Sequence, residues 1–514
     1  MKTIYILAFL LLSSPLLYAQ KSVKSDTIKP NRGNVDKQLD QIKERKEKLH
    51  DTTGNEPVKS KTVDSKIENK YGDILNDDTA YNKKYPVWKP ATQVLGILFF
   101  TWTVDRFVLN ADYARIGIST WKYNINKGWE WDVDRFGINF LGHPYSGALT
   151  FNAARSDGYN YFQSSLFSIG GSLMWEYFGE NTRPSFNDVI NTPINGAFLG
   201  EMLYRLSSNI LDDRTRGMDR FFRELAAGLI DPMRGINRLF QGKSFRTTNK
   251  EVYEKEPLNI SIFAGMHRIN DETSNGFGNG TNSEMINFQF DYGNPFETRS
   301  RKPFDFFKIR TDLNFGVGRK VFDNVIGYGI LFGKNLSLGN MSLLIGGFQY
   351  YDYFDNMTFE LGTIGFGGGL FSKIPFGDKT SLYTNANLAF VPFAGNSTRL
   401  GPDTTQVRDY IFGTGWEWKF ETTLNLGKYL SASLVYYYYM VTTRVGAPGT
   451  NYIQILKPRI TVHIYKDLNV GFEHFIYYDD RYLQDFAALH SVRTEQKLFL
   501  LIYLEDSQRR GKYN

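Results

Sequence analysis

The chain has 514 residues and a formal net charge of +6, and it contains no cysteine. So small a charge on so long a chain gives no reason to expect a nucleic-acid partner. The lack of cysteine excludes disulfides, thiol catalysis and a lipoprotein anchor. Aromatic residues make up 16% of the chain, with 32 Tyr and 41 Phe. Aromatic girdles at both membrane interfaces are typical of outer-membrane β-barrels, so the composition favours that class over a soluble enzyme.

Residues 1–20 have the form of a secretory signal peptide. Lys2 precedes an apolar stretch, and small residues precede a cleavage site near Ala19. We therefore expect the mature chain to leave the cytoplasm. Residues 21–85 are polar and nearly free of aromatic residues, and such a segment cannot bury enough apolar surface to fold. We expect a disordered periplasmic tether there.

Residues 86–250 are expected to form a mainly helical domain. Within it, residues 91–109 have about the length of a membrane-spanning helix. Asp105 and Arg106 lie inside that segment, which favours a helix buried against protein instead. The end of the domain is basic, and we expect a collar at the level of the lipid headgroups from Arg234, Arg238 and Lys243.

A network of polar side chains is predicted near the middle of this domain, among small and aromatic residues. Buried polar groups need partners, so we expect these side chains to contact one another. Arg155 is always charged, and we expect it to pair with Glu176 or Glu180, which lie four residues apart on one helical face. Ser185 and Asp188 have the spacing of a capping box. The full candidate network is Asp132, Asp134, His143, Asn152, Arg155, Glu176, Glu180, Asn187, Asp188 and Glu201.

Three hypotheses for this network remain open. It is a structural or binding network; or it is a hydrolase site, with His143 as general base, Ser156 as nucleophile and Glu176 or Asp188 orienting the imidazole; or His143, Glu176 and Glu180 hold a metal. The chain has no G-x-S-x-G elbow and no H-E-x-x-H motif, so enzymatic activity is undecided and less favoured. One histidine and two carboxylates are few ligands for a metal site, so we expect no metal and no cofactor.

Residues 257–506 alternate with a period of two. In residues 416–426, apolar positions such as Trp418 and Phe420 alternate with polar positions such as Lys419 and Glu421. Alternation of apolar-out and polar-in residues predicts strands of a membrane barrel, with Phe420 facing lipid and Glu421 facing the lumen. Short turns alternate with long polar loops, which are expected near residues 269–282, 393–407, 444–453 and 479–491. The fold class is therefore α+β: a helical region followed by an antiparallel transmembrane β-barrel of about 12 strands.

Several spaced motifs of the helical region occur in order: HPYSGALTFNAARSDGYNYF, WEYFGE, PSFNDVINTP and GAFLGEMLYRLSS. On these motifs the chain resembles a bacterial family of unknown function, DUF3943, over roughly residues 90–245. That family has no assigned activity. The resemblance implies an envelope protein and carries over no catalytic residue.

These observations together predict an outer-membrane protein with its tether in the periplasm. The helical region is expected to plug the barrel or to lie below it as a periplasmic domain. The expected role is structural, binding or transport, with outer-membrane lipid as a partner and lipopolysaccharide or a small molecule as further candidates. The alternative is a hydrolase that modifies envelope lipid or lipopolysaccharide.

Overall fold

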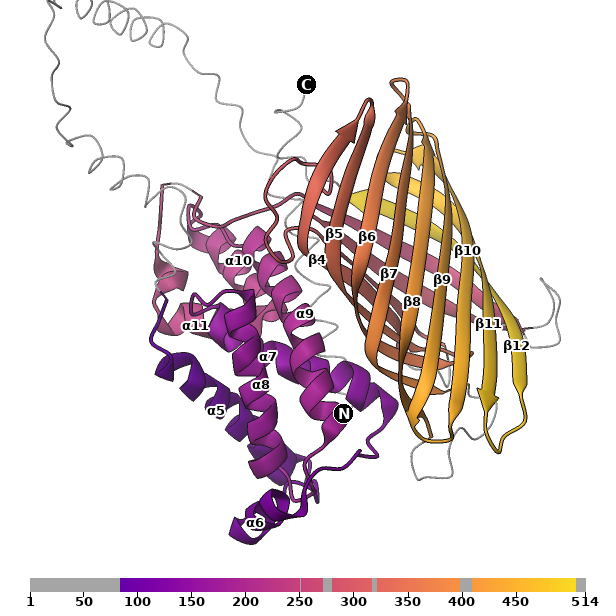
Figure 1. Ribbon diagram of the computed structural model, residues 1–514. Helices are drawn as coiled ribbons and strands as arrows, with labels where there is room; N and C mark the ends of the chain where they lie inside the picture. The colour runs from indigo at the N-terminus through magenta and orange to yellow at the C-terminus, as the bar shows by residue number, and fades with distance from the viewer. Residues whose placement is uncertain (1–83, 250, 271–279, 317–320, 398–408, 505–514) are drawn as a thin grey trace, which may run out of the picture.

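The computed structural model describes residues 84–249, 251–270, 280–316, 321–397 and 409–504. The predicted signal peptide and nearly all of the predicted tether lie outside these residues. The described chain forms a bundle of helices beside a β-barrel (Figure 1). Within the described residues, no helix is long and apolar enough to cross a membrane.

The helical domain consists of seven α-helices within the described residues, together with short π- and 3-10-helical turns. The π-helical turns are Val104–Val108 and Ile138–Gly142, and the 3-10 turn is Lys243–Phe245. The α-helices are α5 (Trp88–Thr103), α6 (Ile118–Lys127), α7 (His143–Arg155), α8 (Tyr161–Phe178), α9 (Phe186–Ile210), α10 (Gly217–Ile230) and α11 (Pro232–Phe240).

Caps and small residues explain how these helices begin and pack. Ser185 Oγ accepts a hydrogen bond from the Asp188 amide at 3.3 Å, so the N-cap predicted at Ser185 is confirmed. The reciprocal half of the predicted capping box is absent, because the Ser185 amide donates to Glu176 instead. Helices α7 and α9 pack backbone against backbone. A Cβ atom on Gly147 would lie 1.9 Å from the Thr192 carbonyl oxygen, and one on Gly196 would meet Gly147 at 2.5 Å. Only glycine permits this approach.

The twelve described strands close into one antiparallel barrel, because β1 pairs with β12 as well as with β2. The predicted fold class and strand number are confirmed. The strands are β1 (Leu258–Asn270), β2 (Gly280–Tyr292), β3 (Phe307–Asn314), β4 (Phe322–Leu338), β5 (Met341–Asp355), β6 (Glu360–Phe376), β7 (Thr380–Ser397), β8 (Ile411–Leu426), β9 (Leu430–Val445), β10 (Gly449–Tyr465), β11 (Leu468–Leu483) and β12 (Leu489–Leu504).

Two of the predicted long loops are wrong. Strand pairing continues through the segments 444–453 and 479–491, where Gly449 pairs with Leu483 and Arg481 pairs with Leu489. Only short turns remain there, since polar residues near a barrel rim extend strands as readily as they form loops. The loops expected near 269–282 and 393–407 lie largely outside the described residues.

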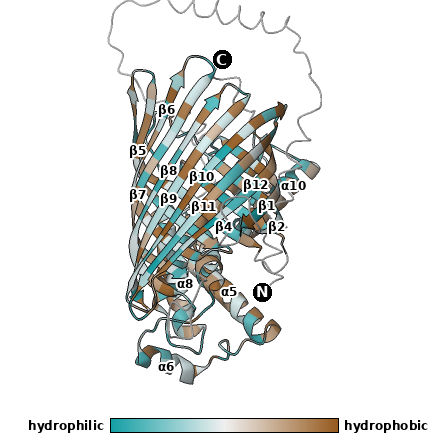
Figure 2. Cartoon of the chain, turned by 90° about the vertical axis from the view of Figure 1, so that its right-hand side faces the viewer, coloured by the Kyte–Doolittle hydropathy of each residue, from teal (hydrophilic) through white to brown (hydrophobic). Residues whose placement is uncertain are grey.

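The predicted strand register is confirmed. Trp416 and Trp418 are exposed on the outer face of β8, whereas the intervening Glu417 is buried in the interior. Glu421 also faces inward, where its carboxylate accepts a hydrogen bond from Lys308 Nζ at 3.0 Å. Figure 2 shows the resulting alternation of hydrophilic and hydrophobic residues along the strands.

The interior of the barrel is filled by the barrel's own side chains. Ion pairs cross it, including Lys497–Asp312 at 2.8 Å and Arg310–Glu473 at 3.3 Å. One end is filled by a buried apolar cluster that includes Phe354, Leu361, Val391, Val435, Tyr437, Tyr439, Ile453, Phe475 and Tyr477. Nearer the other end, Phe306 from the connection between β2 and β3 packs with Tyr328, Phe348 and Phe371.

The helical domain lies on the outside of the barrel wall (Figure 1). Phe140 packs on the outward faces of β6 and β7, where Cβ atoms on Gly362 and Gly395 would approach its ring to 2.2 and 2.3 Å. Tyr161 Oη donates to Gln349 Oε1, on the outward face of β5, at 2.6 Å. The expected plug is therefore wrong, whereas the expectation of a periplasmic domain stays a prediction. The lumen has no room for helices, because inward-facing side chains already occupy it.

A buried ion network joins the helices to each other and to the barrel. Glu201 on α9 binds Arg155 at 2.7 Å and Arg205 at 2.9 Å. Arg205 in turn reaches Asp305, just before β3, at 3.1 Å. The predicted pairing of Arg155 with Glu176 or Glu180 is wrong. Arg155 lies at the far end of α7 from the helix ends that carry those two glutamates, and α9 brings Glu201 next to it.

The position of a residue on the outer wall predicts how much an introduced charge destabilises the barrel. Leu388, in the middle of β7, is 57% exposed, and Tyr429 in the turn after β8 is 64% exposed. We expect Leu388→Arg to destabilise the barrel by about 2–4 kcal/mol and Tyr429→Arg by only about 0–1 kcal/mol, because the cost falls towards the membrane interface. Reversible urea unfolding from lipid vesicles measures both. Equal costs would contradict the assignment of Leu388 to the lipid-facing belt.

The ion network gives a second prediction, read by the same unfolding experiment. Glu201→Gln should cost about 3–5 kcal/mol, because it strands the guanidinium group of Arg155 and leaves that of Arg205 with Asp305 alone. Arg155→Ala should cost less, since Glu201 keeps Arg205. The control is Arg115→Ala, which removes an exposed pair with Asp112 and should cost about 0–1 kcal/mol. If Glu201→Gln lowers the free energy of unfolding no more than Arg115→Ala does, the stabilising role of this ion network is refuted.

Candidate functional site

The strongest cluster of ionisable groups surrounds His143 at the start of α7. His143 Nε2 lies 3.3 Å from Asp188 Oδ1, in the first turn of α9, and 3.6 Å from Asp134 Oδ2. Asp132 completes the group: one ligand-type atom from each of Asp132, His143 and Asp188 lies within 4.8 Å of the others. Two other chain segments, one with Asp132 and Asp134 and one with Asp188, thus converge on the imidazole of His143.

Side-chain amides and a hydroxyl fix the carboxylates of Asp132 and Asp188. Asn139 Nδ2 donates to Asp132 Oδ1 at 3.2 Å, and Ser185 Oγ donates to Asp132 Oδ2 at 3.3 Å. Asn187 Nδ2 donates to Asp188 Oδ1 at 3.0 Å and to Asn139 Oδ1 at 3.0 Å. Asn139 was missed from the sequence, because a lone asparagine carries no signal of its spatial neighbours.

The cluster is also tied to the barrel wall. Tyr410 lies directly before β8, and its hydroxyl accepts a hydrogen bond from Asn139 Nδ2 at 2.6 Å. The same hydroxyl donates to the Asp134 carbonyl oxygen at 2.8 Å. Tyr351 Oη on β5 donates to the Phe140 carbonyl oxygen. The site therefore sits at the seam between the helices and the outer wall, and the barrel helps to fix its geometry.

Charges at the site shift one another's protonation. Burial disfavours the imidazolium, but Asp188, Asp134 and Asp132 outweigh it and raise the pKa of His143 to about 10. Burial raises the pKa of Asp188 well above its usual value, with Asp132 adding to the effect against His143. Burial would also raise the pKa of Asp132, but its contacts with Asp188 and His143 hold it below the usual value. The pKa of each of these three groups therefore depends on the charge of the other two.

Two further predicted residues lie behind this cluster. Glu176 accepts a hydrogen bond from the Ser185 amide at 2.7 Å, and burial raises its pKa to about 8. Glu180 accepts from Trp175 Nε1 at 2.6 Å and from Thr182 Oγ1 at 3.0 Å. Both are engaged as acceptors at the ends of α8 and α9, and the potential ligand atoms come from Asp132 and Asp188 instead.

The hydrolase hypothesis fails on distance. His143 and Ser156 stand at opposite ends of α7, and a rise of 1.5 Å per residue separates them by roughly 20 Å. Ser156 Oγ donates to the Asn152 carbonyl oxygen at 2.5 Å and accepts from Asn237 Nδ2 at 2.6 Å. Asn152, Arg155 and Glu201 likewise lie outside the His143 cluster.

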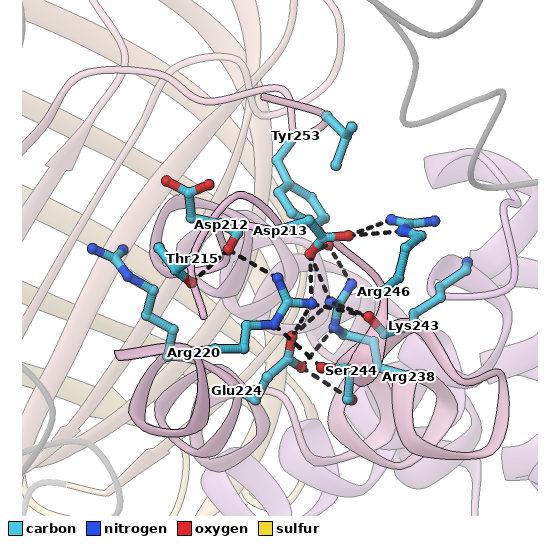
Figure 3. A network of polar contacts seen from close by, with 12 residues as sticks. Asp212, Asp213, Thr215, Arg220, Glu224, Arg238, Lys243, Ser244, Arg246 and Tyr253 are labelled. Atoms are coloured by element: carbon cyan, nitrogen blue, oxygen red, sulfur yellow. Dashed lines mark hydrogen bonds and ion pairs between the residues drawn. The ribbon is translucent and has the colours of Figure 1, made fainter. Parts of the chain in front are cut away.

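A second charged network is structural (Figure 3). Asp213 is fully buried and binds Arg220 at 2.8 Å, Arg238 at 3.0 Å and Arg246 at 2.6 Å. Tyr253 Oη donates to the same carboxylate at 2.6 Å. The expected basic collar is therefore wrong: Arg234, Arg238 and Lys243 are buried. These contacts hold the segment that leads into β1 against α10 and α11.

No curated protein matches the chain. Among solved structures, the NanC porin is 7% identical with a TM-score of 0.28, covering 48% of this chain and 99% of its own. An outer-membrane channel from Pseudomonas putida F1 is 6% identical with a TM-score of 0.27, covering 49% of this chain and 97% of its own. The DcaP channel of Acinetobacter baumannii is 8% identical with a TM-score of 0.22, covering 48% and 96%. The barrel fold of this chain rests on its own strand pairing.

The family comparison falls on the helical domain. Residues 128–233 match the model of DUF3943, a domain of unknown function. The resemblance expected from the motifs is thereby confirmed for this segment, which contains every member of the His143 cluster and the helices that hold it.

Proposed function

We propose that this protein is an outer-membrane barrel with a closed lumen that anchors its helical domain sideways in the lipid layer, and that it acts by binding rather than by passing solutes. The observation that carries the proposal is the reversal of the usual arrangement: the lumen holds barrel side chains and the helices lie outside. Outer-membrane lipid is the proposed partner. The hydrolase alternative lacks its catalytic pair.

The interior of the barrel argues against a diffusion pore. Open porins keep a water-filled channel lined by solvated polar residues. Here the ionic side chains that cross the interior are almost fully buried, including Asp352, Lys419, Glu473 and Lys497. Lys419 Nζ lies 2.5 Å from Asp352, so the charges neutralise one another. An interior of this kind stabilises the barrel and leaves the wall free to serve as a scaffold.

The surface of the helical domain supports contact with lipid. On α8, Phe162, Leu166 and Ile169 are exposed at a spacing that places them on one face. On α5 and the π-helical turn after it, the exposed residues are Leu95, Phe99, Phe100, Phe107 and Val108. The expectation that residues 91–109 are buried against protein therefore holds for one face only, which includes Val94. Exposed apolar surface on this scale is typical of membrane contact.

Continuity with the barrel wall supports lipid as the proposed partner of this surface. Phe162 follows Tyr161, which contacts Gln349 on the outward face of β5. Ile345, four residues away on the same face of that strand, is exposed. Because the outer wall of a membrane barrel faces hydrocarbon, an apolar helix face that continues this wall is expected in the same layer under this proposal.

Conductance tests the closed lumen. The purified protein, reconstituted into planar bilayers, should give no steady ohmic current, because buried ion pairs and aromatic rings block the interior. An open porin reconstituted in the same way is the positive control. Steady current through the folded protein, in proportion to voltage, would refute the proposal.

Site-directed spin labelling tests the lipid contact, and the chain is suited to it because it has no native cysteine. Labels at Phe100→Cys and Leu166→Cys should collide with oxygen more often than with a water-soluble nickel complex, as a label at Leu388→Cys on the wall should. The control is Asp112→Cys, whose native side chain is 93% exposed and should show the opposite preference. Helix labels that behave like the Asp112→Cys label would place the domain in water.

A further inference from the structure

We propose that Asp132, His143 and Asp188 bind a divalent transition-metal ion, with Asp134 supplying a fourth ligand. This inference concerns the helical domain alone and does not depend on a closed lumen. It revises the expectation of no metal, which rested on a different ligand set, His143 with Glu176 and Glu180.

The distances between the donor atoms fit such an ion. Zinc bound by imidazole nitrogen and carboxylate oxygen at about 2.0–2.1 Å in a tetrahedron places neighbouring ligand atoms about 3.3–3.4 Å apart. His143 Nε2 and Asp188 Oδ1 are 3.3 Å apart, and His143 Nε2 and Asp134 Oδ2 are 3.6 Å apart. Asp132, His143 and Asp188 each offer one ligand atom within 4.8 Å of the other two, and Asp134, which lies outside that group, would move in from its half-exposed position to complete the site.

The imidazole nitrogen provides an independent observation. His143 Nε2 is buried, and no contact to it has the geometry of a hydrogen bond, although two carboxylates lie within 4 Å. A protonated imidazole placed among carboxylates would normally direct its N–H at one of them. A buried imidazole nitrogen that has two carboxylate oxygens within 4 Å and no hydrogen bond to either is placed as a metal ligand is.

The surroundings of the carboxylates strengthen this interpretation. Metal-binding carboxylates are held by hydrogen bonds from a second layer of residues. Asn139 and Ser185 hold Asp132, and Asn187 holds Asp188, so each carboxylate keeps its orientation without the ion. Asp134 is half-exposed, which gives an ion a path from solvent.

The donor set indicates the class of ion. Imidazole suits zinc and other late first-row divalent metals, whereas magnesium and calcium prefer sites made only of oxygen. A site with one nitrogen and two or three carboxylate oxygens should therefore select Zn²⁺ over Mg²⁺ and Ca²⁺.

Zinc titration of the full chain in detergent micelles tests the site. Isothermal calorimetry and metal analysis after dialysis should find one Zn²⁺ per folded chain, retained in excess Mg²⁺ and Ca²⁺. We expect His143→Ala and Asp188→Asn to weaken binding by roughly 10–100-fold or more, since losing a ligand exceeds the effect of losing a second-layer partner. The matched control is His490→Ala, which removes an exposed histidine 3.0 Å from Asp480 and should leave binding unchanged.

A heat-modifiable gel shift shows whether each variant is folded. If His143→Ala fails to fold, Asp134→Asn decides, because its half-exposed side chain can be changed without disturbing packing, and it should weaken zinc binding measurably. Wild-type protein that binds no zinc, or variants at His143, Asp188 and Asp134 that all keep wild-type affinity, would overturn the proposal. Equal displacement of zinc by Mg²⁺ or Ca²⁺ would overturn the assigned class of ion.

Discussion

The arrangement of this protein depends on how Phe140 meets the outer wall of the barrel. Its ring is fully buried, stacks 5.0 Å from Phe136 and 5.6 Å from Phe393, and occupies space that exists only because Gly362 and Gly395 have no side chains. Buried aromatic contacts of this size dominate the energy of an interface. They fix the π-helical turn Ile138–Gly142 to the wall, and that turn leads directly into His143.

Position on the wall links the fold to the site. Tyr410 and Tyr351 reach from the barrel to Asn139 and to the backbone at Phe140, so the barrel orients one of the amides that hold Asp132. The ionic network at Glu201 and the network at Asp213 fasten the other end of the domain. Fixed at both ends, the helices hold the site rigidly at the surface of the barrel. In the function proposed here, this outer surface of the barrel is in contact with membrane lipid.

The sequence predicts the barrel well because each strand records its own environment. The alternation of Trp416 and Trp418 with Glu417 and Lys419 sets the register by itself, since one face must meet lipid or an apolar partner and the other must meet charges. The cap at Ser185 is equally local, and it too was predicted correctly. The loops at 444–453 and 479–491 were not, because polar residues at a rim are compatible with either strand or turn.

The placement of the helices and the membership of the site could not be predicted in this way. An outward apolar residue such as Phe393 or Tyr351 has the same pattern whether it faces lipid or Phe140, so the docking surface is hidden in the wall. Helical spacing put Glu176 and Glu180 on one face and suggested them for Arg155, but only the packing of α7 against α9 shows that Glu201 is nearer. Asp132, Asp134, His143, Asn187 and Asp188, which were predicted as part of one larger network, lie close together, whereas Ser156 was joined to His143 by residue type alone and lies at the other end of α7.

The most direct test of the central claim is a side-chain-resolution electron cryomicroscopy structure of the full chain in lipid nanodiscs. The account predicts density for α5 and α8 inside the lipid disc, beside the barrel, with the Phe140 ring against Gly362 and Gly395 and the lumen filled by barrel side chains. Helices inside the lumen, or a helical domain in solvent beyond the disc, would contradict it.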